Sequence, residues 1–292
     1  MARLLLGVAG ALFVLIIMWD AFEALVLPRR VTRRLRPARL FYRSTWWLWR
    51  TTARRMAPGP RRETYLSFYG PLSLLVLLTV WAMSLVIGFG MVYWGLRASL
   101  DVARGTPNFV TDLYMSGTTF FTLGLGDVTP SGVLARILTV VEAGTGFGFL
   151  AVVIGYLPVV YQGFSRREVN ISLLDARAGS PPSAGELLRR HWDAMATLEV
   201  LLQDWERWAA ELLESHVSYP VLSYFRSQHD NQSWLGALTC ILDTCALIIV
   251  GIAGAPARQA RLTFAMARHA AVDLAQVLGT APADSASGRL PG

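Results

Sequence analysis

Residues 111–130 read TDLYMSGTTFFTLGLGDVTP, and this stretch decides the fold. Its first half, about 112–121, is short and mostly apolar, and its second half places Gly124 and Gly126 at alternate positions. Glycine enters left-handed backbone conformations at no steric cost. A backbone that alternates in this way can turn successive carbonyl oxygens to one side, where they replace the water around a dehydrated cation. The stretch therefore predicts a short helix at 112–121 and an ion-binding loop at 122–127.

Long apolar stretches flank and precede this segment. Residues 64–96 carry no charged side chain, 137–165 carry only Glu142, and 4–27 carry only Asp20 and Glu23. A helix needs roughly 20 apolar residues to cross the hydrocarbon core of a bilayer, and all three stretches are long enough. The first stretch has no evident small-residue cleavage site, which disfavours a signal peptide. We therefore predict three membrane crossings.

The arginines orient these crossings. The chain has 27 basic residues, all of them Arg, and 20 acidic residues, for a net charge of +7, yet twelve arginines and no acid lie between 28 and 62. Short Arg-rich connections stay on the cytoplasmic side of a membrane. We expect a multi-pass protein of the plasma (inner) membrane with its amino terminus outside and its carboxyl terminus in the cytoplasm. Because the charge is confined to one short connector, we expect no nucleic-acid partner.

The Arg-rich connector admits two interpretations. Arg30, Arg33, Arg36 and Arg39 recur at every third residue, as gating charges do in voltage-sensing helices. The segment is too polar to span the bilayer, however, and Pro37 interrupts it. Aromatic rings lie between the arginines, and such rings settle at the headgroup level. We predict an interfacial segment that binds anionic inner-leaflet lipids from Arg29 to Arg62.

The run Thr122-Leu123-Gly124-Leu125-Gly126-Asp127 resembles the pore loop of potassium channels, whose signature is Thr-x-Gly-Tyr-Gly-Asp or a close variant. The resemblance covers about 64–164 and is to prokaryotic potassium channels with two transmembrane helices and one pore loop, here with an additional N-terminal transmembrane helix. It implies K⁺ bound by backbone carbonyls of 122–126, with Asp127 at the outer mouth. Four loops ring the ion in that family, and one loop per chain implies a homotetramer.

The resemblance has one departure inside the filter. Leu125 stands where Tyr is commonest, and Leu lacks the hydroxyl that ties the filter to pore-helix aromatics in the family. A Gly-Leu-Gly filter does resemble the second pore loop of some two-pore-domain potassium channels. Leu123 and Leu125 are expected to point away from the pore and to pack behind it.

The predicted inner helix contains candidate gating residues. Gly146 lies 19 residues after Asp127, the spacing of the hinge glycine in several prokaryotic channels of this type. An alternative is that Gly146 and its neighbours Gly144 and Gly148 let helices pack closely. Pro158 is expected to bend the cytoplasmic end of the helix, because it removes a backbone hydrogen bond.

Three carboxylates lie within the apolar stretches, where ionisable residues are functional candidates by default. Glu142 could face the ion pathway or brace the filter from behind, and the sequence leaves both roles open. Asp20 and Glu23 lie near the inner interface, where pairing with the following arginines is the simpler interpretation.

The remaining 110 or so residues predict a cytoplasmic helical domain. A long amphipathic helix is expected from about 183 to 217, opened by the capping pattern Ser183-x-x-Glu186. Residues 234–254 are apolar enough to cross the membrane, but a crossing would bury Asp243 at a cost of about 2.5–3.5 kcal/mol. We interpret them as the buried central helix of the domain.

The predicted fold is an all-α membrane protein with a potassium-channel-like pore, an extra N-terminal helix and a cytoplasmic helical bundle. The expected divisions are a first transmembrane helix at 1–27, an Arg-rich segment at 28–63, a pore domain at 64–164 (outer helix 65–96, pore helix 112–121, filter 122–127, inner helix 133–164), a linker at 165–182, a helical domain at 183–278 and a disordered tail at 279–292.

The predicted function is passive, potassium-selective conduction. The alternatives are a weakly selective cation channel and a non-conducting membrane sensor that acts through its cytoplasmic domain. The sequence has no catalytic triad, nucleophile elbow or phosphate-binding loop. We therefore expect no enzyme activity and no cofactor, with K⁺ as the permeant ligand.

Overall fold

The computed structural model describes residues 1–27, 36–102, 106–229, 231–252 and 254–280. The predicted lipid-facing residues Arg29, Arg30, Arg33 and Arg34 and nearly all of the predicted disordered tail lie outside these ranges. The described residues divide into two compact units. We call 1–27, 36–52 and 71–159 the pore unit, and 53–70 and 160–280 the tail unit, and describe each by itself.

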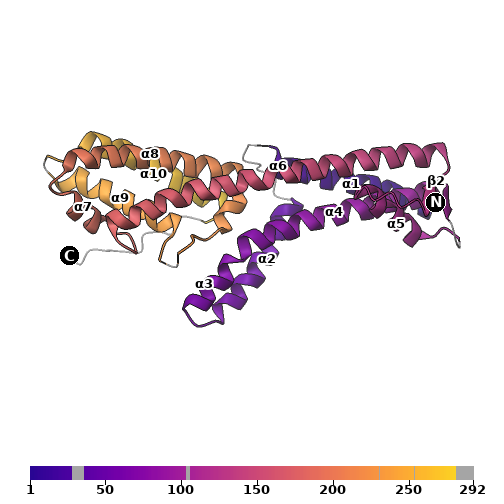
Figure 1. Cartoon of the computed structure of the whole chain (residues 1–292), viewed down its shortest axis with the longest axis horizontal. Coiled ribbons are helices and arrows are strands. Elements are labelled where there is room, and N and C mark those ends of the chain that lie inside the picture. The colour runs from indigo at the N-terminus through magenta and orange to yellow at the C-terminus, as the bar shows by residue number, and fades with distance from the viewer. Residues whose placement is uncertain (28–35, 103–105, 230, 253, 281–292) are drawn as a thin grey trace. The chain divides into compact units, whose positions relative to one another are not determined.

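Helices build almost all of the pore unit (Figure 1). Its elements are α1 (Ala2–Leu25), most of α2 (Pro37–Arg54), most of α4 (Tyr69–Leu96), β1 (Leu100–Val102), α5 (Phe109–Phe120), β2 (Val128–Pro130) and the first part of α6 (Val133–Ala178).

Small residues bring α1 against α4. A Cβ added at Gly7 would lie 3.0 Å from Gly95 Cα, and one added at Gly10 would lie 2.7 Å from the carbonyl oxygen of Gly88. The guanidinium of Arg3 lies 4.1 Å from the centre of the Trp94 ring, near the ends of the same two helices. Glycines on both helices therefore allow the close contact that membrane helices use in place of a hydrophobic driving force.

A two-stranded antiparallel sheet, which the sequence analysis did not predict, joins the two loops around α5. Leu100 pairs with Pro130, Asp101 with Thr129 and Val102 with Val128. A small cluster of Leu100, Met115 and Ala135 lies beside it. Three-residue strands have no hydrophobic periodicity that a sequence window could detect. The pairing of β1 with β2 fixes the segment that follows residues 122–127.

The inner helix α6 is longer than predicted. It runs without a break from Val133 to Ala178 and includes Pro158. The predicted linker at 165–182 is therefore wrong for 165–178, which are helical. Ile171, Leu174 and Ala178 recur at helical spacing and are buried in the tail-unit core, which explains why the helix continues.

The tail unit is a helical bundle. Its further elements are α3 (Pro60–Ser67), α7 (Ala184–His191), α8 (Met195–Ser218), the 3₁₀ helix η1 (Pro220–Tyr224), α9 (Trp234–Gly251) and α10 (Ala257–Val277). The core that these helices and the end of α6 share includes Leu198, Leu202, Trp208, Ile241 and Ala267, all almost fully buried.

The predicted single helix over 183–217 is divided in the structure. Ser183 caps α7 by accepting a hydrogen bond from the amide of Glu186, but Trp192–Ala194 separate α7 from α8. The change of direction lets Leu187 and Leu188 of α7 join the core with α8 and α9, which a straight helix would prevent. Helical periodicity continued across the break, so the sequence pattern did not reveal it.

Helix α9 carries the predicted buried segment 234–254. Ala237, Leu238, Ile241 and Cys245 lie in the tail-unit core. By length and composition alone α9 is also one of four helices, in the part of the chain that the structure describes, that could cross a membrane. Helix α9 packs against α7, α8 and α10, so its apolar residues form part of the core of the bundle.

A buried polar cluster lies where α6, α8 and η1 meet, and His216 of α8 belongs to it. Burial, and secondly the neighbouring Arg167, lower the pKa of His216 from the ordinary 6.5 to about 3. The ring is therefore neutral at physiological pH. Its Nδ1 lies 2.9 Å from the carbonyl oxygen of Leu212, as a donor, which leaves Nε2 to accept from Arg167 Nη1 at 3.2 Å.

The pKa of His216 predicts how the stability of the bundle depends on pH. Between pH 6.5 and 3 the unfolded chain binds a proton that the folded bundle excludes. The contribution of neutral His216 to the free energy of unfolding is complete above pH 6.5. Below pH 6.5 it falls by about 1.4 kcal/mol for each pH unit of acidification. Hydrogen exchange of α8 at pH 7 and pH 5 should show this loss in the wild type. His216→Gln should remove it, and the exposed His269→Gln should not. Equal pH dependence in all three proteins would contradict the prediction.

Candidate ion pathway

The pore helix α5 starts at a side-chain cap. The side chain of Asn108 accepts a hydrogen bond from the amide of Thr111 at 3.0 Å, and the Thr111 hydroxyl accepts from the amide of Asn108 at 3.2 Å. Two otherwise unpaired backbone donors are thereby satisfied. The helix begins at Phe109, three residues before the predicted start at 112, and its last residue is Phe120. It leads directly into the loop 121–127.

Backbone hydrogen bonds hold the start of this loop against the last turn of α5. The amide of Leu123 donates to the carbonyl oxygen of Thr118 at 2.7 Å, and the amide of Thr122 donates to that of Thr119 at 3.0 Å. Movement of the end of α5 would therefore displace the first residues of the predicted filter.

The loop alternates in backbone conformation. Thr122, Gly124 and Gly126 have φ values of +58°, +55° and +79°, and no other residue from 121 to 127 has a positive φ. The two glycines occupy the positions that the sequence analysis assigned to left-handed backbone. Thr122 was not predicted to do so, although its spacing of two residues from Gly124 was the available signal. A non-glycine residue at such a φ is strained and needs support from its surroundings.

The side chains of Leu123 and Leu125 are exposed, at 61% and 64%. The sequence predicts that both pack behind the filter, but no described residue of this chain covers them. Their apolar surface is therefore available to another chain.

Asp127 is tied to the pore helix. The hydroxyl of Tyr114 donates a hydrogen bond to Asp127 Oδ2 at 2.9 Å. Leu125 lacks a hydroxyl that could anchor the predicted filter to the pore helix. In the structure the hydroxyl comes instead from the pore helix, from Tyr114, and it holds Asp127 at the end of the loop. The sequence pattern did not reveal this contact.

Glu142 lies behind the pore helix and is fully buried. The Ser116 hydroxyl of α5 is hydrogen-bonded to Glu142 Oε1 and lies 2.8 Å from the carbonyl oxygen of Val86 in α4. Tyr93 of α4, whose hydroxyl is 3.0 Å from Thr139 Oγ1, joins the outer helix to α6 directly. Of the two roles left open by the sequence, the geometry fits the brace, because Glu142 of the inner helix bonds the pore-helix residue Ser116, which also contacts the outer helix.

This brace predicts a difference between two substitutions. Glu142→Ala removes the hydrogen bond that joins α5 to α6, worth about 0.5–1.5 kcal/mol, and leaves a cavity at a fully buried position. It should therefore lower the melting temperature and speed hydrogen exchange in α5. Glu142→Gln keeps an oxygen acceptor and adds a donor, so it should remain close to the wild type. If Glu142→Ala and Glu142→Gln melt together, the hydrogen bonds of Glu142 do not hold α5.

Gly146 contacts the carboxyl end of α5. A Cβ added there would overlap the carbonyl oxygen of Phe120 and lie 2.9 Å from its carbon, whereas one added at Gly144 or Gly148 would have nothing within 4 Å in this chain. Of the three glycines, Gly146 alone is needed for packing within the chain. A hinge at Gly146 remains a prediction, as does a bend at Pro158, through which α6 continues.

Asp20 and Glu23 anchor the start of α2. Arg36 Nε lies 3.2 Å from Glu23 Oε2 and 3.7 Å from Asp20 Oδ1. Asp20 Oδ2 also accepts hydrogen bonds from the amide of Ala38 at 2.9 Å and from Trp81 Nε1 at 3.0 Å. Both acids therefore pair with an arginine of the following block, as the sequence suggested, and their charge is compensated where α1, α2 and α4 meet.

A short helix and a re-entrant loop between two long apolar helices define the class of pore-loop membrane proteins. Residues 74–162 match the model of the family described as ion channel, so this part of the chain is similar to that family. Among the described residues four helices are long and apolar enough to cross a membrane, and the predicted all-α, multi-pass membrane fold with a channel domain is confirmed.

Two relatives are similar to the chain. One is the uncharacterized membrane protein YdjJ of Bacillus subtilis (strain 168), 24% identical over 210 residues, which are 70% of this chain and 60% of YdjJ. The other is protein LctB of Bacillus caldotenax, 33% identical over 90 residues, which are 27% of this chain and 66% of LctB. The aligned part of the chain thus spans less than two thirds of either relative. No solved structure matches the chain.

Proposed function

We propose that the protein is a passive, potassium-selective channel whose filter is formed by 122–127 of four copies. One observation carries the proposal: the alternation of left-handed backbone at Thr122, Gly124 and Gly126 in a loop between two membrane helices. Backbone carbonyls of 122–126 bind K⁺, and Asp127 lies at the outer mouth. A filter of carbonyl rings replaces the ion's hydration shell and needs no cofactor.

The exposed apolar side chains support assembly from four copies. Leu123 and Leu125 are uncovered in one chain, and the same holds for Ile137, Val140 and Phe147 on α6. Irregular backbone at membrane depth is tolerated only where it lines a cavity or is buried in protein. Neighbouring copies supply that burial. Cross-linking in membranes should give tetramers, and a limit at dimers would contradict the assembly.

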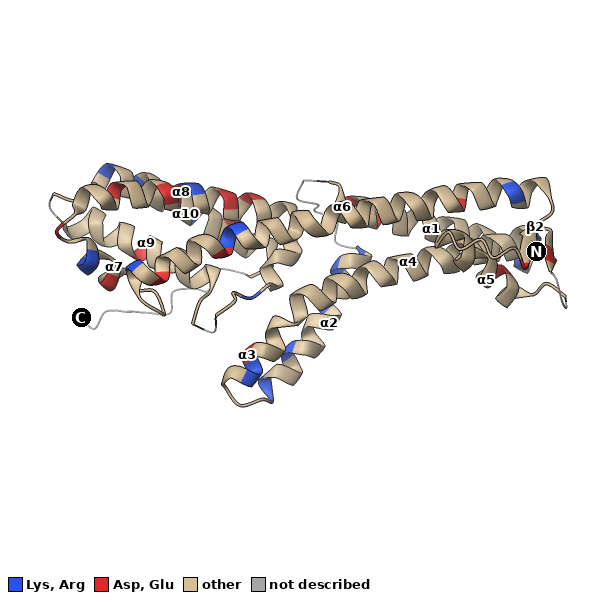
Figure 2. Ribbon diagram, viewed as in Figure 1, with Lys and Arg blue, Asp and Glu red and all other residues tan. Residues whose placement is uncertain are grey.

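The Arg-rich helix α2 supports binding to anionic inner-leaflet lipids. Its exposed residues include Arg39, Arg43, Leu40 and Trp47, so cationic and large apolar side chains occur together. Figure 2 shows basic residues on α2 and α3, whereas α4 carries no charged residue. Arginines attract lipid phosphates while the apolar groups enter the headgroup region. With α2 at the inner leaflet, the proposed orientation has the amino terminus outside and the tail unit in the cytoplasm.

Purified protein in a planar bilayer tests the function. With K⁺ and Na⁺ exchanged across the bilayer, the reversal potential should follow the K⁺ gradient. A reversal potential that ignores the exchange would favour a weakly selective cation channel, to which the missing filter hydroxyl at Leu125 would contribute. No current at all would reject conduction and favour a sensor acting through the tail unit.

A further inference from the structure

The segment 219–227 lies between α8 and α9 and contains η1 (Pro220–Tyr224). We call it the clamp segment. Within the tail unit it contacts both helices that lead into the channel domain, the continuation of α6 and the start of α4. Phe225 takes part in both sets of contacts, which are described in turn.

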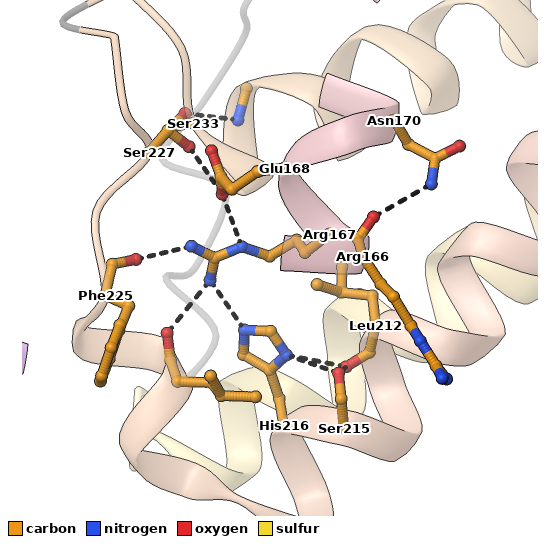
Figure 3. Close-up of polar contacts among 12 residues, drawn as sticks. Arg166, Arg167, Glu168, Asn170, Leu212, Ser215, His216, Phe225, Ser227 and Ser233 are labelled. Carbon is orange, nitrogen blue, oxygen red and sulfur yellow. Dashed lines mark hydrogen bonds and ion pairs between the residues drawn. The ribbon is translucent and has the colours of Figure 1, made fainter. Parts of the chain in front are cut away.

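Arg167 of α6 makes the central contact with the clamp segment (Figure 3). Its Nη1 donates to the carbonyl oxygen of Leu222 at 3.1 Å, and its Nη2 donates to that of Phe225 at 2.8 Å. Nη1 also lies 3.2 Å from His216 Nε2 on α8. The planar guanidinium can hold several acceptors in a fixed arrangement, which an ammonium group cannot. One side chain of α6 therefore fixes the position of two clamp carbonyls.

The charge of Arg167 is compensated within the same cluster. Arg167 is 3% exposed, and its Nε donates to Glu168 Oε1 at 2.9 Å. Ser227, at the end of the clamp segment, donates to the same Glu168 oxygen at 3.2 Å. A buried charge is tolerated when it is paired and hydrogen-bonded, and removal of one partner is costly. The cluster thus resists rearrangement as long as the clamp segment stays in place.

Apolar contacts extend this attachment. The rings of Phe164 and Phe225 lie 5.6 Å apart, and a Cβ added at Gly163 would lie 3.2 Å from Leu222 Cδ1. The clamp segment therefore covers about one turn of α6 before Arg167 as well.

The second set of contacts is with α3 and the start of α4. The rings of Tyr69 and Tyr224 lie 5.2 Å apart, and a Cβ added at Gly70 would lie 2.7 Å from the Phe225 ring. Arg226 forms an ion pair with Glu63 of α3. Consecutive residues of one segment thus hold the cytoplasmic ends of the outer and inner helices of the channel domain.

We propose that the clamp segment couples the bundle of the tail unit to the gate of the channel, with Arg167 as the positioning residue on the inner helix. The proposal rests on the proposed function, because a gate requires a conducting pore. Movement of α8 or α9 displaces the segment that joins them, and the segment carries this displacement to α6 and α4. If the clamp segment moves, the contacted ends of α6 and α4 must move with it, or their contacts with the segment must break.

Single-channel recording of the full-length protein tests this coupling. Arg167→Lys keeps the charge but loses the planar guanidinium that bonds two clamp carbonyls at once. Arg166→Lys, at the exposed neighbouring position, is the matched control. Arg167→Lys should shift the open probability by about fivefold or more, the scale of typical coupling energies. Unitary conductance, K⁺ over Na⁺ preference and tetramer yield should stay at wild-type values, because the filter is untouched. Arg166→Lys should match the wild type throughout.

A charge exchange at the outer helix provides a rescue. Arg226→Glu and Glu63→Arg should each shift the open probability, and the double variant should return toward the wild-type value. Wild-type open probability in Arg167→Lys, or no rescue in the double variant, would overturn the coupling.

A second readout separates this proposal from the proposed function. If the wild type carries no current, conduction is rejected, and hydrogen exchange of 160–170 then decides on the clamp. Faster exchange there in Arg167→Lys than in Arg166→Lys supports attachment of α6 through Arg167. Equal exchange in the two variants overturns it.

Discussion

Replacing Gly124 with alanine is expected to abolish potassium flux while the chain stays folded and in the membrane. Gly124 has a φ of +55°, and a Cβ added there would have nothing within 4 Å in this chain. Within one copy the effect therefore comes from the backbone and not from a clash. Left-handed backbone costs an alanine roughly 1–2 kcal/mol. Four copies around one ion carry that cost together, about 4–8 kcal/mol for a complete ring.

The chain can relieve this strain by turning a peptide group, which removes a carbonyl oxygen from the ring. Because 1.36 kcal/mol corresponds to a factor of ten in rate, we expect K⁺ flux to fall by about 100-fold or more. Liposome flux, thermal melting and cross-linking should be measured on the same preparation. Melting and assembly should change much less than flux.

Gly144→Ala is the matched control for Gly124→Ala. Gly144 lies in the regular part of α6, and a Cβ added there would also have nothing within 4 Å in this chain. Alanine favours helix over glycine, so flux should remain within about twofold of the wild type. Unchanged flux in Gly124→Ala would remove 122–127 from the ion pathway.

The membrane helices and the glycine alternation could be predicted because both are local properties of the sequence. An uncharged run such as 64–96 is long enough to cross a bilayer whatever surrounds it. The need for left-handed backbone at Gly124 and Gly126 likewise follows from the residue type. The divided helix at Trp192–Ala194 was missed because tertiary packing, not local pattern, ends α7 there.

Polar contacts between helices could not be predicted in the same way. Arg166 and Arg167 are identical neighbours in the sequence and both fell in the predicted linker at 165–182, yet the structure exposes the first and buries the second. Glu142 was identified as a candidate, but its contact with Ser116 of α5 depends on how three helices meet. The sequence shows that residues able to make these contacts are present. It does not show which side chains on different helices pair with one another.

Gly146→Ala is the second substitution expected to have a large effect, and here the cause is a clash. Its Cβ would overlap the carbonyl oxygen of Phe120, the last residue of the pore helix. Phe120 is fully buried, and its ring lies 5.9 Å from that of Phe149, so it has little room to move. Overpacking a close contact typically costs 1–3 kcal/mol. Displacement of Phe120 would also reach the predicted filter, because the amide of Thr122 donates a hydrogen bond to the carbonyl oxygen of Thr119, the residue before Phe120.

We therefore expect Gly146→Ala to lose most of its flux and to melt at a lower temperature than the wild type. Gly148→Ala, in the same helix and with nothing within 4 Å of its Cβ in this chain, should melt as the wild type does. A hinge makes a different prediction, since loss of a flexible residue alters the open probability without lowering stability. If Gly146→Ala melts and assembles normally but opens differently, Gly146 acts as a hinge and the packing argument is wrong. If Gly146→Ala melts early while Gly148→Ala does not, contact with Phe120 is the reason that only glycine fits at this position.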